Sequence, residues 1–132
     1  MEKTVLIVED DHSIRETIKE ILEYEGYAVL QAENGQEALD VLRESPKLPH
    51  LIFLDLMMPV KDGFAFRKEQ ESDPVLKDIP VVIMSADGHV FEKKARIGAT
   101  DYLQKPAELD EIFEVLNKHF PIKLNSSQME HP

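Results

Sequence analysis

Near its amino terminus the chain runs Val5-Leu6-Ile7-Val8-Glu9-Asp10-Asp11, an apolar segment that ends abruptly in three acids. Other short apolar runs follow along the chain. With the first, they make up the set Thr4–Val8, Tyr27–Ala32, Leu51–Leu54, Ile79–Met84 and Thr100–Leu103. Short continuous apolar runs between polar segments are typical of strands that are buried on both faces of a parallel sheet.

Longer amphipathic segments separate these runs. Helical spacing relates Ile14, Ile18, Ile21 and Leu22, and Gly26 is suited to end that helix in a left-handed conformation. Asn34 followed by Glu37 is a helix-start signal. It opens a second helix with the buried face Ala38, Leu39 and Leu42. We expect three further helices, at Gly63 to about Ser72, His89–Ile97 and Leu109–Leu116.

Strands that alternate with helices predict an α/β fold, a doubly wound parallel sheet with helices on both faces. A chain of 132 residues suits the five-stranded, flavodoxin-like (βα)5 arrangement with strand order 2-1-3-4-5. We expect a single domain over residues 1–121, followed by a polar C-terminal tail over residues 122–132.

Composition excludes several functions. There are 26 acidic residues against 15 Lys and Arg, and the net charge of −11 disfavours direct nucleic-acid binding and a membrane-surface role. The chain has no cysteine, which excludes a disulfide scaffold, a thiolate zinc site and a cysteine nucleophile. The apolar run at Thr4–Val8 is too short for a signal peptide or a membrane span, so we expect a cytoplasmic protein.

Polar residues stand where the predicted strands end. The first strand ends in Glu9-Asp10-Asp11 and the third in Asp55, while Ser85 and Lys105 follow the fourth and fifth. In the predicted fold all of these meet at one edge of the sheet. Clustered carboxylates require a counter-ion, and the candidates are Lys105 and an oxygen-bound divalent cation such as Mg²⁺.

This combination of side chains suits a phosphoryl group. Its oxygens would complete the coordination of a carboxylate-bound metal, and Ser85 and Lys105 would add a hydroxyl and a positive charge. A carboxylate can itself act as the nucleophile and form an aspartyl-phosphate. Asp55 is the best candidate nucleophile, because it has no like charge beside it in the sequence.

Four segments then identify a family resemblance. The chain resembles the receiver domain of two-component response regulators over residues 3 to about 120. The segments are Val5–Asp11, Leu54–Gly63 (Leu-Asp-Leu-Met-Met-Pro-Val-Lys-Asp-Gly), Val82–Ala86 (Val-Ile-Met-Ser-Ala) and Gly98–Pro106 (Gly-Ala-Thr-Asp-Tyr-Leu-Gln-Lys-Pro).

The resemblance implies a role for individual residues. Asp55 would accept a phosphoryl group from a sensor histidine kinase or a histidine phosphotransfer protein, with Mg²⁺ required. Asp10 would bind the metal directly, Glu9 through water, and Met57 through its backbone carbonyl. Ser85 and Tyr102 stand at the switch positions. Lys105 is the family lysine, and its bond to Pro106 would be cis.

The resemblance also implies a signalling domain rather than an enzyme acting on other molecules. We expect a single-domain regulator or phosphorelay intermediate with a separate effector protein. Arg67 and Ala107 depart from the apolar helix residue and the aromatic that many receivers have. The last helix carries Asp110, Glu111 and Glu114, which argues against dimerisation through that helix and favours a monomer or weak dimer.

Other interpretations fit less well. An FMN carrier would need a phosphate-binding loop where Glu9-Asp10-Asp11 stand, and these acids would repel the phosphate. An aspartyl phosphatase would need a second Asp at the position of Met57. A nucleotide hydrolase would need a glycine-rich loop, which the sequence lacks. The main alternative is a receiver fold that serves only as a binding module. Asp11 is at most peripheral or a helix cap, and Met57-Met58 suggest packing. We expect the histidines to be solvated, namely His12, His50, His89, His119 and His131.

Overall fold

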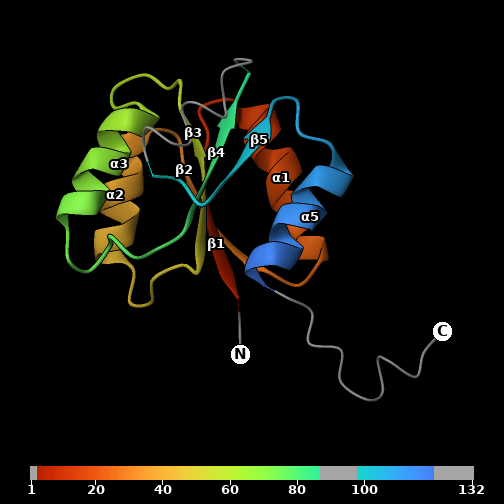
Figure 1. Ribbon diagram of the computed structural model, residues 1–132, viewed down its shortest axis with the longest axis horizontal. Coiled ribbons are helices and arrows are strands. Elements are labelled where there is room, and N and C mark those ends of the chain that lie inside the picture. Colours follow the sequence, from red (N-terminus) through yellow and green to blue (C-terminus); the bar gives the residue numbers. More distant parts are fainter. Residues whose placement is uncertain (1–2, 87–97, 121–132) are drawn as a thin grey trace.

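A computed structural model describes residues 3–86 and 98–120. A central sheet separates two helical layers, with α2 and α3 on one face and α1 and α5 on the other (Figure 1). The order along the chain is β1 (Thr4–Val8), α1 (His12–Tyr24), β2 (Ala28–Ala32), α2 (Gly35–Glu44), β3 (Leu51–Asp55), α3 (Gly63–Ser72), β4 (Val81–Ser85), β5 (Asp101–Gln104) and α5 (Leu109–His119).

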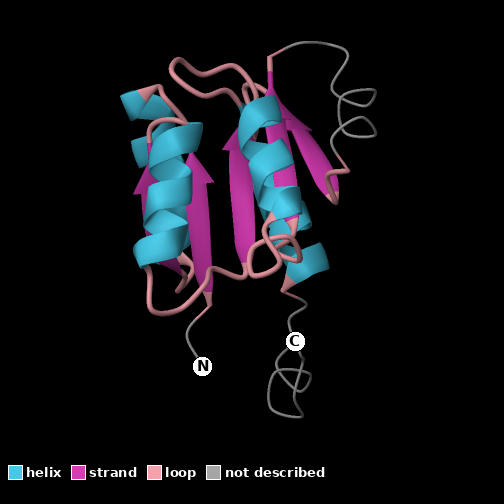
Figure 2. Cartoon of the chain, turned by 90° about the vertical axis from the view of Figure 1, so that its left-hand side faces the viewer, coloured by secondary structure: helices cyan, strands magenta, loops and turns pink. Residues whose placement is uncertain are grey.

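The five strands are parallel and follow the order β2-β1-β3-β4-β5, which confirms the predicted topology. In Figure 2 all the strand arrowheads point the same way, so the carboxyl ends of the five strands lie together at one end of the sheet. The register pairs Val8 with Leu54 and Ser85 with Gln104. The residues that follow β1 therefore stand beside the end of β3.

Strand burial differs from the prediction at the two sheet edges. The central strands β3 and β4 are buried throughout, and β1 is buried beyond its first residue. The outer strands β2 and β5 are only partly buried, because each has a neighbouring strand on one side alone. Strands β3, β4 and β5 also extend into the polar residues Asp55, Ser85 and Gln104. These side chains are thus placed by sheet hydrogen bonding.

Local signals explain where the helices begin and end. Asn34 and Asp62 accept hydrogen bonds from the backbone at the starts of α2 and α3, and α3 spans the predicted residues. Gly26 has φ +92°, as expected after α1. The predicted face of α1 was partly wrong, because Ile14 is 37% exposed and Arg15 lies on the buried face.

Two apolar cores flank the sheet. Side chains alternate along β1 and β3, so Leu6 and Leu54 pack with α2 and α3, and Ile7 and Phe53 pack with α1 and α5. Among the described helices, none combines the length and apolarity needed to cross a bilayer. The predicted helix at His89–Ile97 and the tail over residues 122–132 lie outside the described residues.

Candidate functional site

Three carboxylates meet at the junction of β1 and β3, as predicted. Glu9, Asp10 and Asp55 can each place an oxygen within 4.8 Å of the others. Glu9 and Asp55 are buried, whereas Asp10 is exposed. The cluster therefore has two carboxylates in the protein interior and one at its surface.

Backbone hydrogen bonds shape the loop that carries two of these acids. The Glu9 N–H donates to the Ala32 carbonyl (3.0 Å), which continues the β1–β2 pairing by one residue. The Asp11 N–H donates to Glu9 Oε2 (3.2 Å). The Ile14 N–H donates to Asp11 Oδ1 (3.0 Å), so Asp11 caps α1. This confirms the helix cap that was one of the two readings of Asp11.

Lys105 neutralises part of the cluster. Its Nζ lies 2.5 Å from Glu9 Oε1 and 3.2 Å from Asp55 Oδ2. The Lys105 N–H also donates to the Ser85 carbonyl (2.8 Å), which fixes its backbone to the end of β4, and the Lys105–Pro106 bond is cis as expected. Lys105 therefore joins the ends of β1, β3 and β4 through a single side chain and its backbone.

The buried acids are strongly perturbed. Burial raises the pKa of Glu9 to about 7, with Lys105 opposing the change and Asp55 adding to it. Burial also raises the pKa of Asp55, although Glu9 and Lys105 lower it. Burial alone would lower the pKa of Lys105, but the two acids outweigh it and the pKa is raised. Lys105 is thus charged, and Glu9 gains or loses its proton around neutral pH.

This donor set fits a hard divalent cation. Three carboxylates share one nearby ammonium, so full ionisation leaves two negative charges that a divalent cation would neutralise. All the donors are oxygen atoms, which Mg²⁺ prefers. Met57 lies next to the cluster, where its N–H donates to Asp55 Oδ1 (3.2 Å). The side chain of Met57 is 67% exposed rather than packed, contrary to the packing role expected for it.

Gly63 determines how closely the start of α3 approaches Asp55. A Cβ on Gly63 would lie 2.7 Å from the Asp55 carbonyl oxygen and 2.8 Å from Leu56 Cα. The Gly63 N–H donates to the Leu56 carbonyl (3.1 Å). Only glycine allows the start of α3 to pack directly on the end of β3. In the sequence, the only indication of this close packing was the Asp62-Gly63 pair, a helix cap followed by a glycine at the start of α3.

The loop between β3 and α3 is held from outside. The Gly35 N–H donates to the Lys61 carbonyl (2.8 Å), and the Lys61 side chain pairs with Glu69 of α3. Val60 adopts φ +68°, which is a rare conformation for a β-branched residue, and is 85% exposed. The surrounding contacts thus hold a strained residue beside the site.

The two predicted switch residues lie on neighbouring strands. Ser85 is buried at the end of β4, immediately before the chain leaves the sheet. Tyr102 lies in β5, in register with Ile83, and packs partly buried against the core beneath α2 and α3. Ser85 thus lies at the end of β4 that carries the site, and Tyr102 lies on the adjacent outer strand β5.

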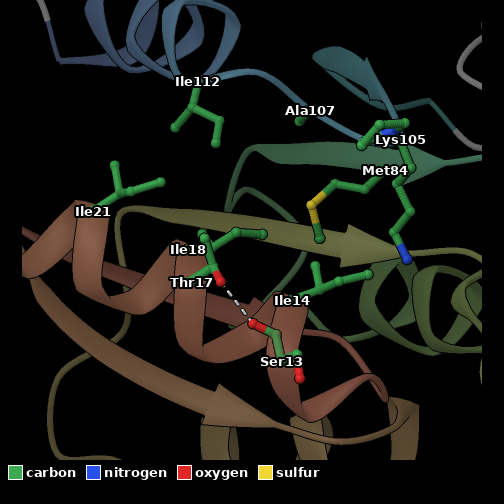
Figure 3. A pocket seen from close by; sticks show the side chains of 10 residues that line it. Ser13, Ile14, Thr17, Ile18, Ile21, Met84, Lys105, Ala107 and Ile112 are labelled. Atoms are coloured by element: carbon green, nitrogen blue, oxygen red, sulfur yellow. Dashed lines mark hydrogen bonds between the residues drawn. The ribbon is translucent and has the colours of Figure 1, made fainter.

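An apolar groove opens next to Lys105. It has a volume of about 240 Å³ and lies between α1 and the segment that joins β5 to α5. Figure 3 shows Ile18, Ile21 and Ile112 lining it, with Ala107 at its rim and the Lys105 side chain running along one end. The small side chain of Ala107, where many receivers have an aromatic, contributes no bulk to this groove.

Two polar side chains outside the cluster are partly or largely buried. The Nε2 atom of His119 is buried without a hydrogen bond among the described residues, and burial lowers its pKa. The prediction that His119 is solvated was therefore wrong in part, because the residue is half-buried and its Nε2 atom is fully buried. Arg67 has a largely buried side chain that donates to the Gly98 carbonyl (3.3 Å), so α3 contacts the segment before β5.

A family model for the response regulator receiver domain matches residues 5–117. The chain therefore belongs to the response regulator receiver family. Receiver domains are signalling domains that accept phosphoryl groups in two-component systems, where they act with histidine kinases or phosphotransfer proteins. The family binds Mg²⁺ at its acidic pocket, the place that the cluster of Glu9, Asp10 and Asp55 occupies here.

Individual relatives agree with this assignment. The chain is 34% identical to the sporulation initiation phosphotransferase F of Bacillus subtilis (strain 168), over 95% of this chain and 99% of that protein. It is 40% identical to the phosphate regulon transcriptional regulatory protein PhoB of Pseudomonas aeruginosa, over 79% of this chain and 45% of that protein. The structure of the chemotaxis response regulator CheY4 of Vibrio cholerae matches with a TM-score of 0.81 and 29% identity, covering 90% of this chain and 99% of that one.

Proposed function

We propose that Asp55 is the phosphoryl acceptor of this chain and that the domain catalyses its own phosphorylation from a phosphohistidine donor. A carboxylate oxygen of Asp55 forms a bond to phosphorus while the phosphorus–nitrogen bond of the donor breaks, and the released imidazole nitrogen takes a proton from solvent. The observation that carries the proposal is the convergence of two acids and one lysine on Asp55.

Each neighbour of Asp55 has a distinct task. Lys105, 3.2 Å from Asp55 Oδ2, stabilises negative charge on the transferring group. Glu9, Asp10 and Asp55, with the Met57 carbonyl, would hold Mg²⁺, which supplies charge neutralisation and orientation of the phosphoryl oxygens. Ser85 would donate its hydroxyl to a phosphoryl oxygen. The raised pKa of Glu9 means that metal binding requires loss of its proton.

Labelling tests the acceptor. Wild-type protein incubated with radiolabelled acetyl phosphate and Mg²⁺ should incorporate about one phosphoryl group per chain, and Asp55→Asn should incorporate none, because the amide is not a nucleophile. Asp11→Asn is the matched control, since Asp11 is a neighbouring acid in the loop after β1 whose side chain caps α1. Wild-type labelling of Asp55→Asn would exclude Asp55 as the acceptor. Full labelling in EDTA would exclude the metal.

We further propose that the phosphohistidine partner docks on the rim of the site. The exposed apolar side chains of Ile14, Met57 and Val60 belong to segments that surround it, and the groove beside Lys105 continues the same surface. A partner must bring its phosphohistidine to Asp55, so its surface around that histidine must cover this rim.

A phosphorelay role, with the group passed from Asp55 to a second protein's histidine, is the more specific proposal. It is supported by the similarity to a phosphotransferase over 99% of that protein's length. In the labelling experiment, label that moves to an added histidine phosphotransfer protein supports the relay. Label that is lost only to water supports an endpoint regulator. A chain that takes no label at all would be a pure binding module.

A further inference from the structure

Arg15 occupies a position of α1 that the helical pattern reserves for the core. The buried residues of α1 are Arg15, Ile18 and Leu22, spaced three and four apart along one face. Arg15 is only 7% exposed. Burying a guanidinium is costly unless it is paired, so the polar contacts of Arg15 indicate its role.

The contacts of Arg15 point toward the acidic loop. Nη1 donates to the Glu9 backbone carbonyl (2.8 Å), in a buried hydrogen bond. Nη2 donates to His12 Nδ1 (3.0 Å), and it lies 3.9 Å from Glu33 Oε1 in the loop after β2. Arginine is only a donor, so each of these partners acts as an acceptor. The guanidinium therefore links the loop after β1 to the loop after β2.

The hydrogen bond to Glu9 completes the fixation of that residue. Its N–H is held by Ala32, its carboxylate by the Asp11 N–H and Lys105, and its carbonyl by Arg15. The carbonyl of Glu9 belongs to the peptide unit that leads into Asp10. Fixing that unit sets the direction in which the exposed Asp10 carboxylate leaves the loop.

We propose that Arg15 is a positioning residue for the divalent cation site, acting through the Glu9–Asp10 peptide unit. The inference rests on the proposed metal site of Glu9, Asp10 and Asp55. Arg15 touches neither the metal nor the phosphoryl group. Its effect is to limit the orientations of two ligand side chains, so its loss weakens metal binding rather than removing a ligand.

The variants separate positioning from packing. Arg15→Met keeps an unbranched apolar stem in the core and removes every hydrogen bond of the guanidinium. Arg15→Lys keeps the charge but replaces the two separate donor nitrogens of the guanidinium, which contact Glu9 and His12, by a single ammonium nitrogen. Arg43→Met is the matched control, because Arg43 is half exposed and its nearest acid is Asp73 at 4.0 Å.

Mg²⁺ alone is the probe, titrated into the full chain and followed by calorimetry and amide NMR, with urea unfolding in EDTA measured in parallel. Loss of an outer-shell partner weakens metal sites by roughly 10- to 100-fold. We expect on the order of a tenfold rise in the Mg²⁺ Kd for Arg15→Met, a smaller rise for Arg15→Lys and none for Arg43→Met.

A wild-type Kd in folded Arg15→Met would overturn the inference. If Arg15→Met fails to fold, Arg15→Lys decides, because a purely structural role predicts reduced stability with an unchanged Kd. If the wild-type chain itself binds no Mg²⁺, the proposed metal site fails, and the inference fails with it for that separate reason. Loss of labelling in Asp55→Asn is independent of all these results.

Discussion

At the scale of single residues, Gly63 shows how little space separates the end of β3 from α3. Any Cβ there would sit under 3 Å from backbone atoms of Asp55 and Leu56, which cannot move as a flexible side chain can. We expect Gly63→Ala to destabilise the domain by about 1–3 kcal/mol, as overpacking does. The initial rate of acetyl phosphate labelling should also fall, because relief of the clash displaces Asp55.

Gly26→Ala provides the comparison for Gly63→Ala. A Cβ at Gly26 meets nothing within 4 Å, but the residue has φ +92°, so the substitution costs stability through backbone strain alone. Urea unfolding should show both variants destabilised, whereas labelling should be slowed only in Gly63→Ala. Equal labelling rates in the two variants would show that the packing of α3 on β3 does not position Asp55.

Residue-level contacts also mark the limit of what the sequence could predict. The strand order followed from the number of apolar runs and the chain length. The carboxylate cluster and Lys105 followed from the residues that end those runs, since the carboxyl ends of parallel strands lie together. The core position of Arg15 was missed, because helical spacing counted Ile14 and Ile21 instead. The complete burial of Glu9 and its pairing with Lys105 depend on tertiary contacts, which local sequence patterns do not contain.

At the scale of elements, the expected signal path runs from β4 to β5 and α5. A phosphoryl group on Asp55 should draw the Ser85 hydroxyl toward its oxygens and let Tyr102 rotate inward, shifting a balance of pre-existing states. Beryllofluoride with Mg²⁺ mimics the phosphoryl group. It should cause amide NMR shifts through β5 and α5, and Ser85→Ala should shrink the shifts that are remote from Asp55.

Two results would argue against this coupling between elements. One is a set of shifts confined to residues around Asp55 in the wild-type chain. The other is a remote pattern that persists unchanged in Ser85→Ala, which would assign the transmission to another contact. Thr100→Ala is a suitable control, because Thr100 precedes β5 and its N–H is already committed to the Val81 carbonyl (2.9 Å).

At the scale of the whole molecule, the raised pKa of Glu9 links stability to pH. Between the ordinary value of 4.5 and about 7, folded Glu9 holds a proton that the unfolded chain releases. The free energy of unfolding should therefore fall as pH rises through this window, by roughly 3 kcal/mol from this group. Saturating Mg²⁺ at about pH 8 should restore stability, because it binds only the folded, deprotonated cluster.

Urea unfolding in EDTA at several pH values, for wild type and Glu9→Gln, measures this contribution as a difference. The comparison is needed because His119 acts in the opposite direction, its lowered pKa making the folded state less stable as pH falls below about 6.5. Parallel pH profiles for the two proteins would mean that Glu9 carries no proton in the folded state at neutral pH.

The groove beside Lys105 has a consequence for cells that contain many such domains. A hollow of about 240 Å³ bordered by Ala107 has room for a side chain of a docking protein, and a receiver with an aromatic at that position would have less room for one. Steric exclusion of this kind would let a kinase with a protruding residue discriminate between receivers, because that residue would clash wherever the hollow is filled. Ala107 would then be a determinant of partner specificity, and replacing it with an aromatic residue would change which kinase the domain accepts without changing its phosphorylation chemistry.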